Sequence, residues 1–154
     1  MTVTLDGTDW VILAELQRDG RISLTELGRR VSLSASAVTE RVKRLESAGV
    51  ITGYRAEVDV ESVGFAVLAV VRLKYPGNRH EPLHQLLGER AEILECLRTT
   101  GDDCYLLKVA ATSMSHLERL VNELAEFGST TTNLVYSQPL PYRGPRAPLT
   151  PDTR

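Results

Sequence analysis

The side chains best suited to chemistry in this sequence lie in one stretch, residues 34–49. Its outward positions carry short polar groups first and cations afterwards: Ser36, Glu40, Lys43 and Ser47, flanked by Arg41 and Arg44. Small polar side chains can approach base edges in the DNA major groove, while lysine and arginine reach phosphates. The pattern therefore predicts a DNA-reading helix. An ordinary surface helix with solvated charges is the alternative.

Individual positions in and before this stretch have expected roles at DNA. Ser34 is expected to cap the start of the helix. The positions expected to face base edges are Ser36, Ala37, Thr39 and Glu40. A glutamate there can accept a hydrogen bond from a cytosine amino group. The cations expected to meet phosphates are Arg29, Arg30, Arg41, Lys43 and Arg44. For the first two of these, plain solvation is the alternative.

Two further helices are needed to hold that stretch in place. Asp6 can cap a first helix that ends near Arg18. Ser23 and Glu26 match a capping box, which predicts a second helix ending near Val31.

The third helix has its own buried stripe, with apolar residues at spacings of four and three: Val38, Val42 and Leu45. Gly49 can end this helix in a left-handed conformation. A tight turn over 32–34 joins the second helix to the third, so the segment is a helix-turn-helix. Residues 50–59 then alternate like a strand.

Composition limits the classes of function. The chain has 154 residues, 42% of them apolar, which fits one medium or two small globular domains. Its net charge of −2 means that DNA affinity has to come from a local patch. Two cysteines build neither a disulfide framework nor a four-ligand metal site. Without a signal peptide or a long apolar run, we expect a cytoplasmic protein with no metal or cofactor.

The second half alternates between strand and helix signals. Strands are expected at 65–75, 93–100, 104–111 and 130–137. Between them lie two amphipathic helices, and a Gly-Asp-Asp turn makes the middle strands a hairpin. This βαββαβ order predicts a ferredoxin-like domain, with an antiparallel sheet and both helices on one face. The free face of such a sheet is suited to dimerisation.

The fold class is therefore α+β. We expect a winged-type helix-turn-helix domain at 1–52, a linker strand at 53–64, a ferredoxin-like domain at 65–138, and a tail at 139–154. The tail holds most of the chain's seven prolines and is expected to be extended or disordered. His80 and His84 have metal-compatible spacing but no third ligand nearby, so we expect two exposed histidines.

Two stretches resemble the Lrp/AsnC, or feast/famine, family of bacterial and archaeal transcription regulators. The stretch at 5–54 resembles the family's N-terminal module, and 100–109, TGDDCYLLKV, resembles its second signature. The resemblance extends over about 5–138. It implies a regulator that binds double-stranded DNA and, through an effector-binding and oligomerisation domain at 65–138, a small effector, usually an amino acid. It also implies dimers formed through the sheets, which assemble into tetramers, octamers or larger discs.

The resemblance also implies an effector site, between dimers and near the hairpin. Its residues would be Thr100, Gly101 and Asp102 on the hairpin and Thr132 on the last strand. Free turn N–H groups can bind a carboxylate and an aspartate can bind an ammonium group, although these residues also suit a simple turn.

The chain departs from the family pattern at two of these positions. Cys104 stands where the family has a second acid, and Asp103 is one residue off. Leu134 stands where many relatives have Thr or Ser. A less polar site favours an apolar or aromatic amino acid.

Two other functions remain open on the sequence alone. One is an architectural, nucleoid-type protein with little sequence preference. Weak discrimination between a palindromic promoter site and random DNA, with a steep salt dependence of the affinity, would favour it. The other is an enzyme related to the sirohaem decarboxylases, which resemble this family. The scarcity of histidine on the sheet segments argues against that enzyme, and no catalytic triad or paired catalytic carboxylates are evident. We therefore expect no enzymatic activity.

Overall fold

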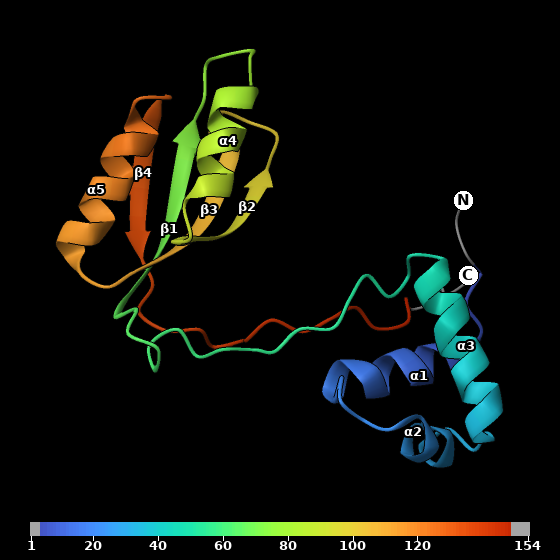
Figure 1. Cartoon of the computed structure of the whole chain (residues 1–154). Coiled ribbons are helices and arrows are strands. Elements are labelled where there is room, and N and C mark those ends of the chain that lie inside the picture. Colours follow the sequence, from blue (N-terminus) through green and yellow to red (C-terminus); the bar gives the residue numbers. More distant parts are fainter. Residues whose placement is uncertain (1–3, 149–154) are drawn as a thin grey trace, which may run out of the picture. The chain divides into compact units, whose positions relative to one another are not determined.

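The structure, a computed structural model, describes residues 4–148. The chain divides into two compact units, one running to Glu57 and resuming at Leu140, and the other spanning Val58–Pro139 (Figure 1). The last part of the expected tail, 149–154, lies outside the described residues. Within those residues, no helix has the length and apolar character needed to cross a membrane.

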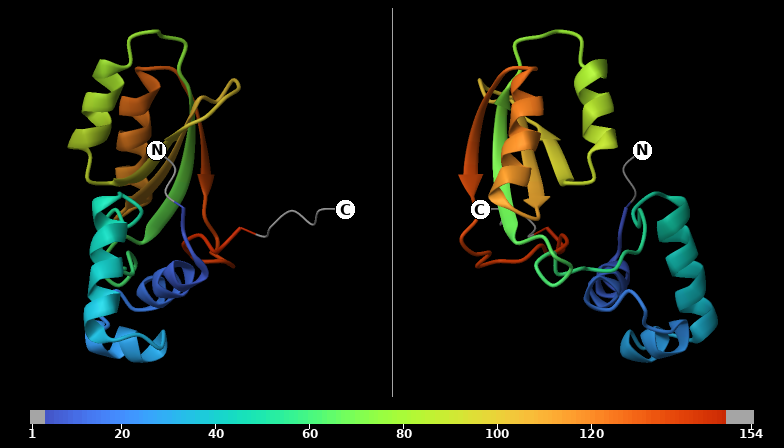
Figure 2. Two further views of the ribbon diagram at one scale, coloured as in Figure 1. Left: turned by 90° about the vertical axis from the view of Figure 1, so that its right-hand side faces the viewer. Right: turned by 60° about the vertical axis from the view of Figure 1, so that its left-hand side comes forward.

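The first unit contains the expected helices, α1 (Gly7–Arg18), α2 (Leu24–Arg30) and α3 (Ala35–Ser47) (Figure 2). Each begins at the expected cap. Asp6 accepts from the backbone N–H of Asp9 at 2.8 Å, and Ser23 and Ser34 each accept, at 3.2 Å, from the N–H three residues on. These side chains satisfy N–H groups that have no partner within their helix.

A close backbone contact sets the turn between α2 and α3. The N–H of Leu33 donates to the carbonyl of Gly28 at 2.8 Å. A Cβ on Gly28 would lie 2.8 Å from the Leu33 carbonyl oxygen, so only glycine fits without a shift. The buried stripe of α3 then packs against α1 and α2 in one core: Ile12, Leu27, Val38, Val42 and Leu45.

The prediction of a strand at 50–59, and with it of a linker strand at 53–64, is wrong. Residues 52–59 have no strand pairing, and 60–64 form turns. A strand is held by hydrogen bonds to a neighbouring strand. The described strands all belong to one four-stranded sheet in the second unit. The alternating residues of 50–59 therefore have no neighbouring strand to pair with, and they do not form a strand.

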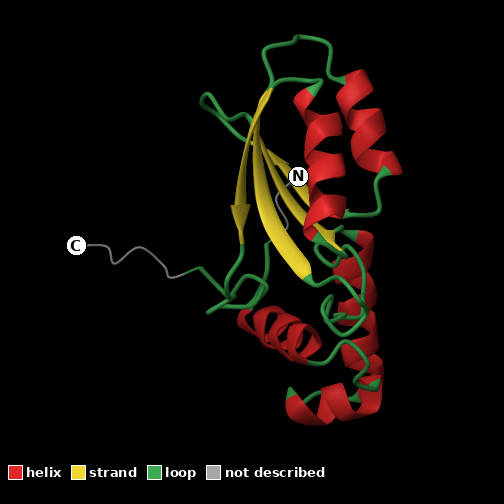
Figure 3. Cartoon of the chain, turned by 90° about the vertical axis from the view of Figure 1, so that its left-hand side faces the viewer, coloured by secondary structure: helices red, strands yellow, loops and turns green. Residues whose placement is uncertain are grey.

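The second unit has the expected order: β1 (Val67–Lys74), α4 (Glu81–Glu89), β2 (Ile93–Arg98), β3 (Tyr105–Ala111), α5 (Met114–Ala125) and β4 (Ser129–Leu134). The strands pair antiparallel in the order β2-β3-β1-β4, which confirms the ferredoxin-like topology. Both helices cover the same face of the sheet (Figure 3). β4 ends three residues earlier than expected.

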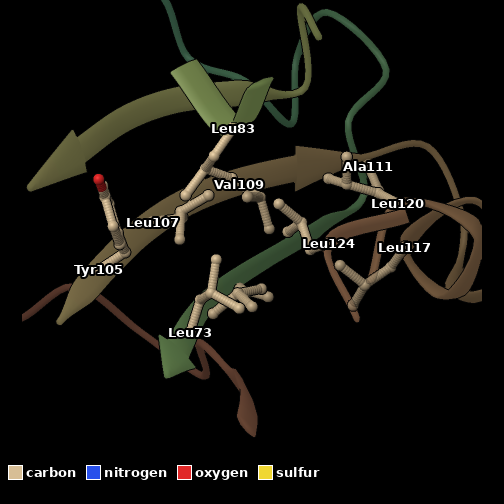
Figure 4. Packing of buried hydrophobic residues seen from close by; sticks show 11 residues of the cluster. Leu73, Leu83, Tyr105, Leu107, Val109, Ala111, Leu117, Leu120 and Leu124 are labelled. Carbon is tan, nitrogen blue, oxygen red and sulfur yellow. The ribbon is translucent and has the colours of Figure 1, made fainter. Parts of the chain in front are cut away.

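Every second residue of β3, and of β1 from Ala69 on, faces the helices and is buried. These residues and the leucines of α4 and α5 form one core (Figure 4): Ala69, Val71, Leu73, Leu83, Tyr105, Leu107, Val109, Ala111, Leu117, Leu120 and Leu124. At one end Gly128 lies against β1, where a Cβ would come within 2.1 Å of the Lys74 carbonyl oxygen. The remaining residues of β1 and β3 face the uncovered side of the sheet.

Candidate DNA interface and effector site

The outward side of α3 is presented as the sequence predicts. Ser36, Glu40 and Lys43 are exposed, while Val42 on the opposite side is 6% exposed. The Ser34 and Ser36 hydroxyls lie 3.1 Å apart at the start of the helix. The buried stripe thus fixes which side chains α3 presents.

Two of the predicted base-reading positions are less accessible to DNA than the others. Ala37 and Thr39 are half-buried. The Thr39 hydroxyl donates to the Ala35 carbonyl at 2.6 Å, one turn back on its own helix. This hydroxyl therefore has to break a local bond before it can donate to a base.

Two of the predicted phosphate contacts hold α3 to α1. Arg41 donates through Nη1 to Asp6 at 2.7 Å and to Asp9 at 2.8 Å. Arg44 donates through Nη2 to both carboxylate oxygens of Asp9 at 2.7 Å. The Asp9 side chain is fully buried. The Arg41 guanidinium lowers the pKa of the Asp6 carboxyl. A structural role is therefore added to the expected one.

The two arginines of α2 also have acidic partners. Arg29 makes a two-pronged contact with Glu26, at 2.8 and 2.7 Å, and Arg30 reaches Glu26 and Glu15 at 2.9 and 2.8 Å. These arginines lower the pKa of Glu26 to about 2. The Glu26 carboxylate therefore pairs with these arginines and does not complete the predicted capping box. The Arg29 side chain remains 76% exposed.

Lys43 differs from these four arginines. Among residues 4–148 it forms no ion pair, and it lies on the exposed side of α3. Each arginine still has unused N–H donors, because a guanidinium carries five of them. The sequence did not reveal these acids as arginine partners. Asp6 and Glu26 were interpreted as capping residues, Asp9 is a first-turn acid, and Glu15 lies outside the motif.

The predicted effector residues of the hairpin lie at its exposed tip. Gly101 has a φ of 102°, which favours glycine. The Asp102 side chain is 90% exposed, with its carboxylate 3.4 Å from the Lys74 ammonium. Asp103 instead pairs with Arg72 at 3.2 Å, and its carbonyl accepts from the Thr99 hydroxyl at 2.8 Å. Thr100 is exposed beside them.

The remaining predicted effector residues do not join that tip within one chain. Thr132 pairs with Val71 and Leu134 with Ala69, so both lie on the helix-covered side of the sheet. Lys74, which holds Asp102, alternates to the other side. Cys104 packs against the core, its sulfur 3.6 Å from the Tyr75 carbonyl oxygen. The six residues form no common pocket in a single chain.

The uncovered side of the sheet carries a shallow apolar hollow of about 260 Å³. It is lined mainly by Leu68, Val70, Leu97, Leu106 and Val135. Leu97 is 48% exposed there. This is the face that the sequence predicts for dimerisation.

His80 and His84, both expected to be exposed, contact one buried tyrosine: His84 is exposed as expected, whereas His80 is half-buried. The Tyr105 hydroxyl lies 2.8 Å from Nδ1 of His80 and 3.1 Å from Nε2 of His84. Tyr105 is 1% exposed, and burial raises its pKa. Over the part of the chain that the structure describes, no group of three or more His, Cys, Asp or Glu could hold a metal ion.

Comparison with known protein families accounts for both units. A model described as winged helix-turn-helix DNA-binding matches residues 5–52, and the Lrp/AsnC ligand binding domain matches 68–145. The transcriptional regulator LrpC of Bacillus subtilis is 36% identical over 134 residues, 87% of this chain and 93% of its own length. The chain belongs to the Lrp/AsnC family. It is therefore a helix-turn-helix transcriptional regulator, and the α+β fold class is confirmed.

Solved structures of other members of the Lrp/AsnC family agree with this one. That of B. subtilis LrpC has a TM-score of 0.85 and 35% identity, covering 88% of this chain and 97% of its own. A feast or famine regulatory protein from Mycobacterium tuberculosis, complexed with L-methionine, has a TM-score of 0.86 and 32% identity, covering 93% and 99%. A transcriptional regulator from Neisseria meningitidis, also in complex with L-methionine, has a TM-score of 0.83 and 32% identity, covering 91% and 94%.

Proposed function

We propose that this Lrp/AsnC regulator reads double-stranded DNA with α3 and that an amino acid tunes its DNA binding or assembly. The observation that carries the DNA proposal is the exposed side of α3. This capped helix, anchored by its buried stripe, exposes Ser36 and Glu40 in its first two turns and Lys43 further along. Such a helix can enter the major groove with its N-terminal residues at the base edges.

The four arginines of α2 and α3 would have to share their N–H donors between acidic side chains and DNA phosphates. The four arginines are already partnered by acids, which reduces the local positive charge. Lys43 adds a charge without such a partner, so we propose it as the leading phosphate contact. Arg29 follows, because its side chain is the more exposed of the two on α2.

Replacing Lys43 by alanine should weaken DNA binding by roughly the same factor for every sequence. One lost phosphate contact lowers the slope of log affinity against log salt concentration by about 1. Fluorescence anisotropy titrations at several salt concentrations measure this slope. Arg18→Ala is the control, because it removes a cation at the end of α1. An unchanged slope for Lys43→Ala would exclude the contact.

We propose that the effector is an apolar amino acid held at the hairpin. Asp102 offers an exposed carboxylate to the ammonium group of the effector, and backbone N–H groups of the turn can donate hydrogen bonds to its carboxylate. The inward Cys104 leaves few polar groups at the hairpin for an effector side chain, and the apolar Leu134, which is 49% exposed, can add to the site only from a neighbouring chain. The two relatives solved with L-methionine support this class of ligand.

Asp102→Ala should abolish stabilisation by the effector. A ligand at about a hundred times its dissociation constant stabilises a protein by roughly 2.7 kcal/mol. Thermal-shift measurements against the twenty amino acids, with L-methionine as first probe, would detect this in the unaltered chain. Asp103→Ala is the matched control, because it lies on the same turn but pairs with Arg72. An equal ligand response in both variants would contradict the assignment of Asp102.

The uncovered face of the sheet supports a proposal for how the chains assemble. We propose that two chains pair through the apolar hollow on the uncovered face, and that dimers assemble further into tetramers or octamers. Exposed leucines and valines on this face would be buried by a second sheet. Residues separated within one chain, such as Asp102 and Thr132, can then meet across neighbouring chains. Such a regulator would act on DNA in the cytoplasm and would need no enzymatic activity.

A further inference from the structure

The C-terminal segment 140–148, which belongs to the tail expected to be extended or disordered, lies against the helix-turn-helix unit (Figure 1). The amide of Gln17, on α1, donates to the Pro145 carbonyl at 3.1 Å. The Arg55 guanidinium lies over the Tyr142 ring, 5.5 Å from its centroid. Gly144 packs so closely that a Cβ would overlap the Gln17 side chain.

These contacts border a hollow of about 740 Å³ within the same unit. Its apolar lining comes from α1 and from the segment that follows α3, including Trp10, Leu13, Ile51 and Tyr54. Tyr142, Gly144 and Pro145 of the C-terminal segment line the same hollow. Prolines at 141, 145 and 148 restrict the backbone before docking, so little conformational freedom is lost. Aromatic-lined grooves commonly bind proline-rich segments of this kind.

We propose that residues 140–148 form an intramolecular strap that docks on α1 and residues 50–57. The second unit is then inserted into the first, entered at Val58 and left at Pro139. The strap continues directly from β4, the strand that carries Thr132 and Leu134. Two chain segments, instead of one linker, then join the two units.

Two readouts test the strap in the full-length protein. Trypsin can cleave after Arg143 and Arg146, both exposed but restrained when the segment is docked. Trp10, the single tryptophan, lines the hollow and reports its solvent access by fluorescence. The variant Gln17→Ala/Tyr142→Ala removes the hydrogen bond and the ring. Its cleavage at these arginines should be about tenfold faster, because the docked state loses two contacts.

The Trp10 emission of this double variant should also shift to longer wavelength. Tyr142→Phe keeps the aromatic ring and is the matched control, so it should behave as the unaltered protein. A helical circular dichroism signal equal to that of the unaltered protein verifies that the unit is folded.

Two results would overturn the proposal. Equal cleavage rates and emission in the double variant and the unaltered protein would show that the segment is not docked. Protection that disappears on dilution would show that the segment docks on another copy of the chain instead of its own.

Discussion

Asp9→Ala is expected to destabilise the helix-turn-helix unit by about 2–3 kcal/mol and to weaken DNA binding with it. The Asp9 side chain is fully buried and accepts from both Arg41 and Arg44. Removing it leaves two guanidinium groups without their anchor. Because these side chains are 30% and 49% exposed, they can turn to water, which keeps the cost below that of a fully buried pair.

The loss can be measured by urea unfolding followed through Trp10, which lies next to Asp9 in the chain. Asp19→Ala is the control, because Asp19 is exposed at the other end of the same helix. Asp9→Asn keeps the shape and removes the charge, so it should fall between the two. If Asp9→Ala unfolded at the same urea concentration as Asp19→Ala, the anchor role of Asp9 would be wrong.

Gly128→Ala is expected to destabilise the ferredoxin-like unit by about 3 kcal/mol. A Cβ at this position would lie 2.1 Å from the Lys74 carbonyl oxygen and 3.1 Å from Cδ of Pro76. Both neighbours belong to the end of β1 and the loop after it, so the backbone has to move. Because Lys74 also holds Asp102, the shift should weaken the response to an amino-acid effector.

Differential scanning calorimetry measures this change, with Gly88→Ala as the control. Nothing lies within 4 Å of a Cβ at Gly88, in the last turn of α4. Alanine is favoured over glycine in a helix, so the control should be neutral or slightly stabilising. Equal unfolding temperatures for the two variants would falsify the packing argument.

The sequence predicts those parts of the fold that depend on local signals. Caps at Asp6, Ser23 and Ser34 and the stripe on α3 are visible as residue types at fixed spacings. The βαββαβ order follows from apolar runs separated by turns. These features depend on neighbours within a few residues, so a single sequence is sufficient to find them.

Contacts between distant residues were not predictable in the same way. Asp9 looks like an ordinary first-turn acid until Arg41 and Arg44 fold against it from α3. Residues 50–59 alternate like a strand, but a strand needs a neighbouring strand to pair with, and the described part of this unit has none. His80 is half-buried instead of exposed because its partner, Tyr105, lies in β3, distant in the sequence. The docked C-terminal segment likewise depends on contacts across most of the chain.

The central claim is that this chain is a sequence-specific DNA-binding regulator that responds to an amino acid. The most direct test is selection of duplexes from a random pool by the full-length protein, followed by affinity measurements with and without L-methionine. The account predicts enrichment of a two-fold symmetric site, bound about a thousandfold more tightly than random DNA. It also predicts that L-methionine or another apolar amino acid changes this affinity or the size of the assembly. No enriched sequence, with affinity set by salt alone, would contradict the account and indicate an architectural DNA-binding protein.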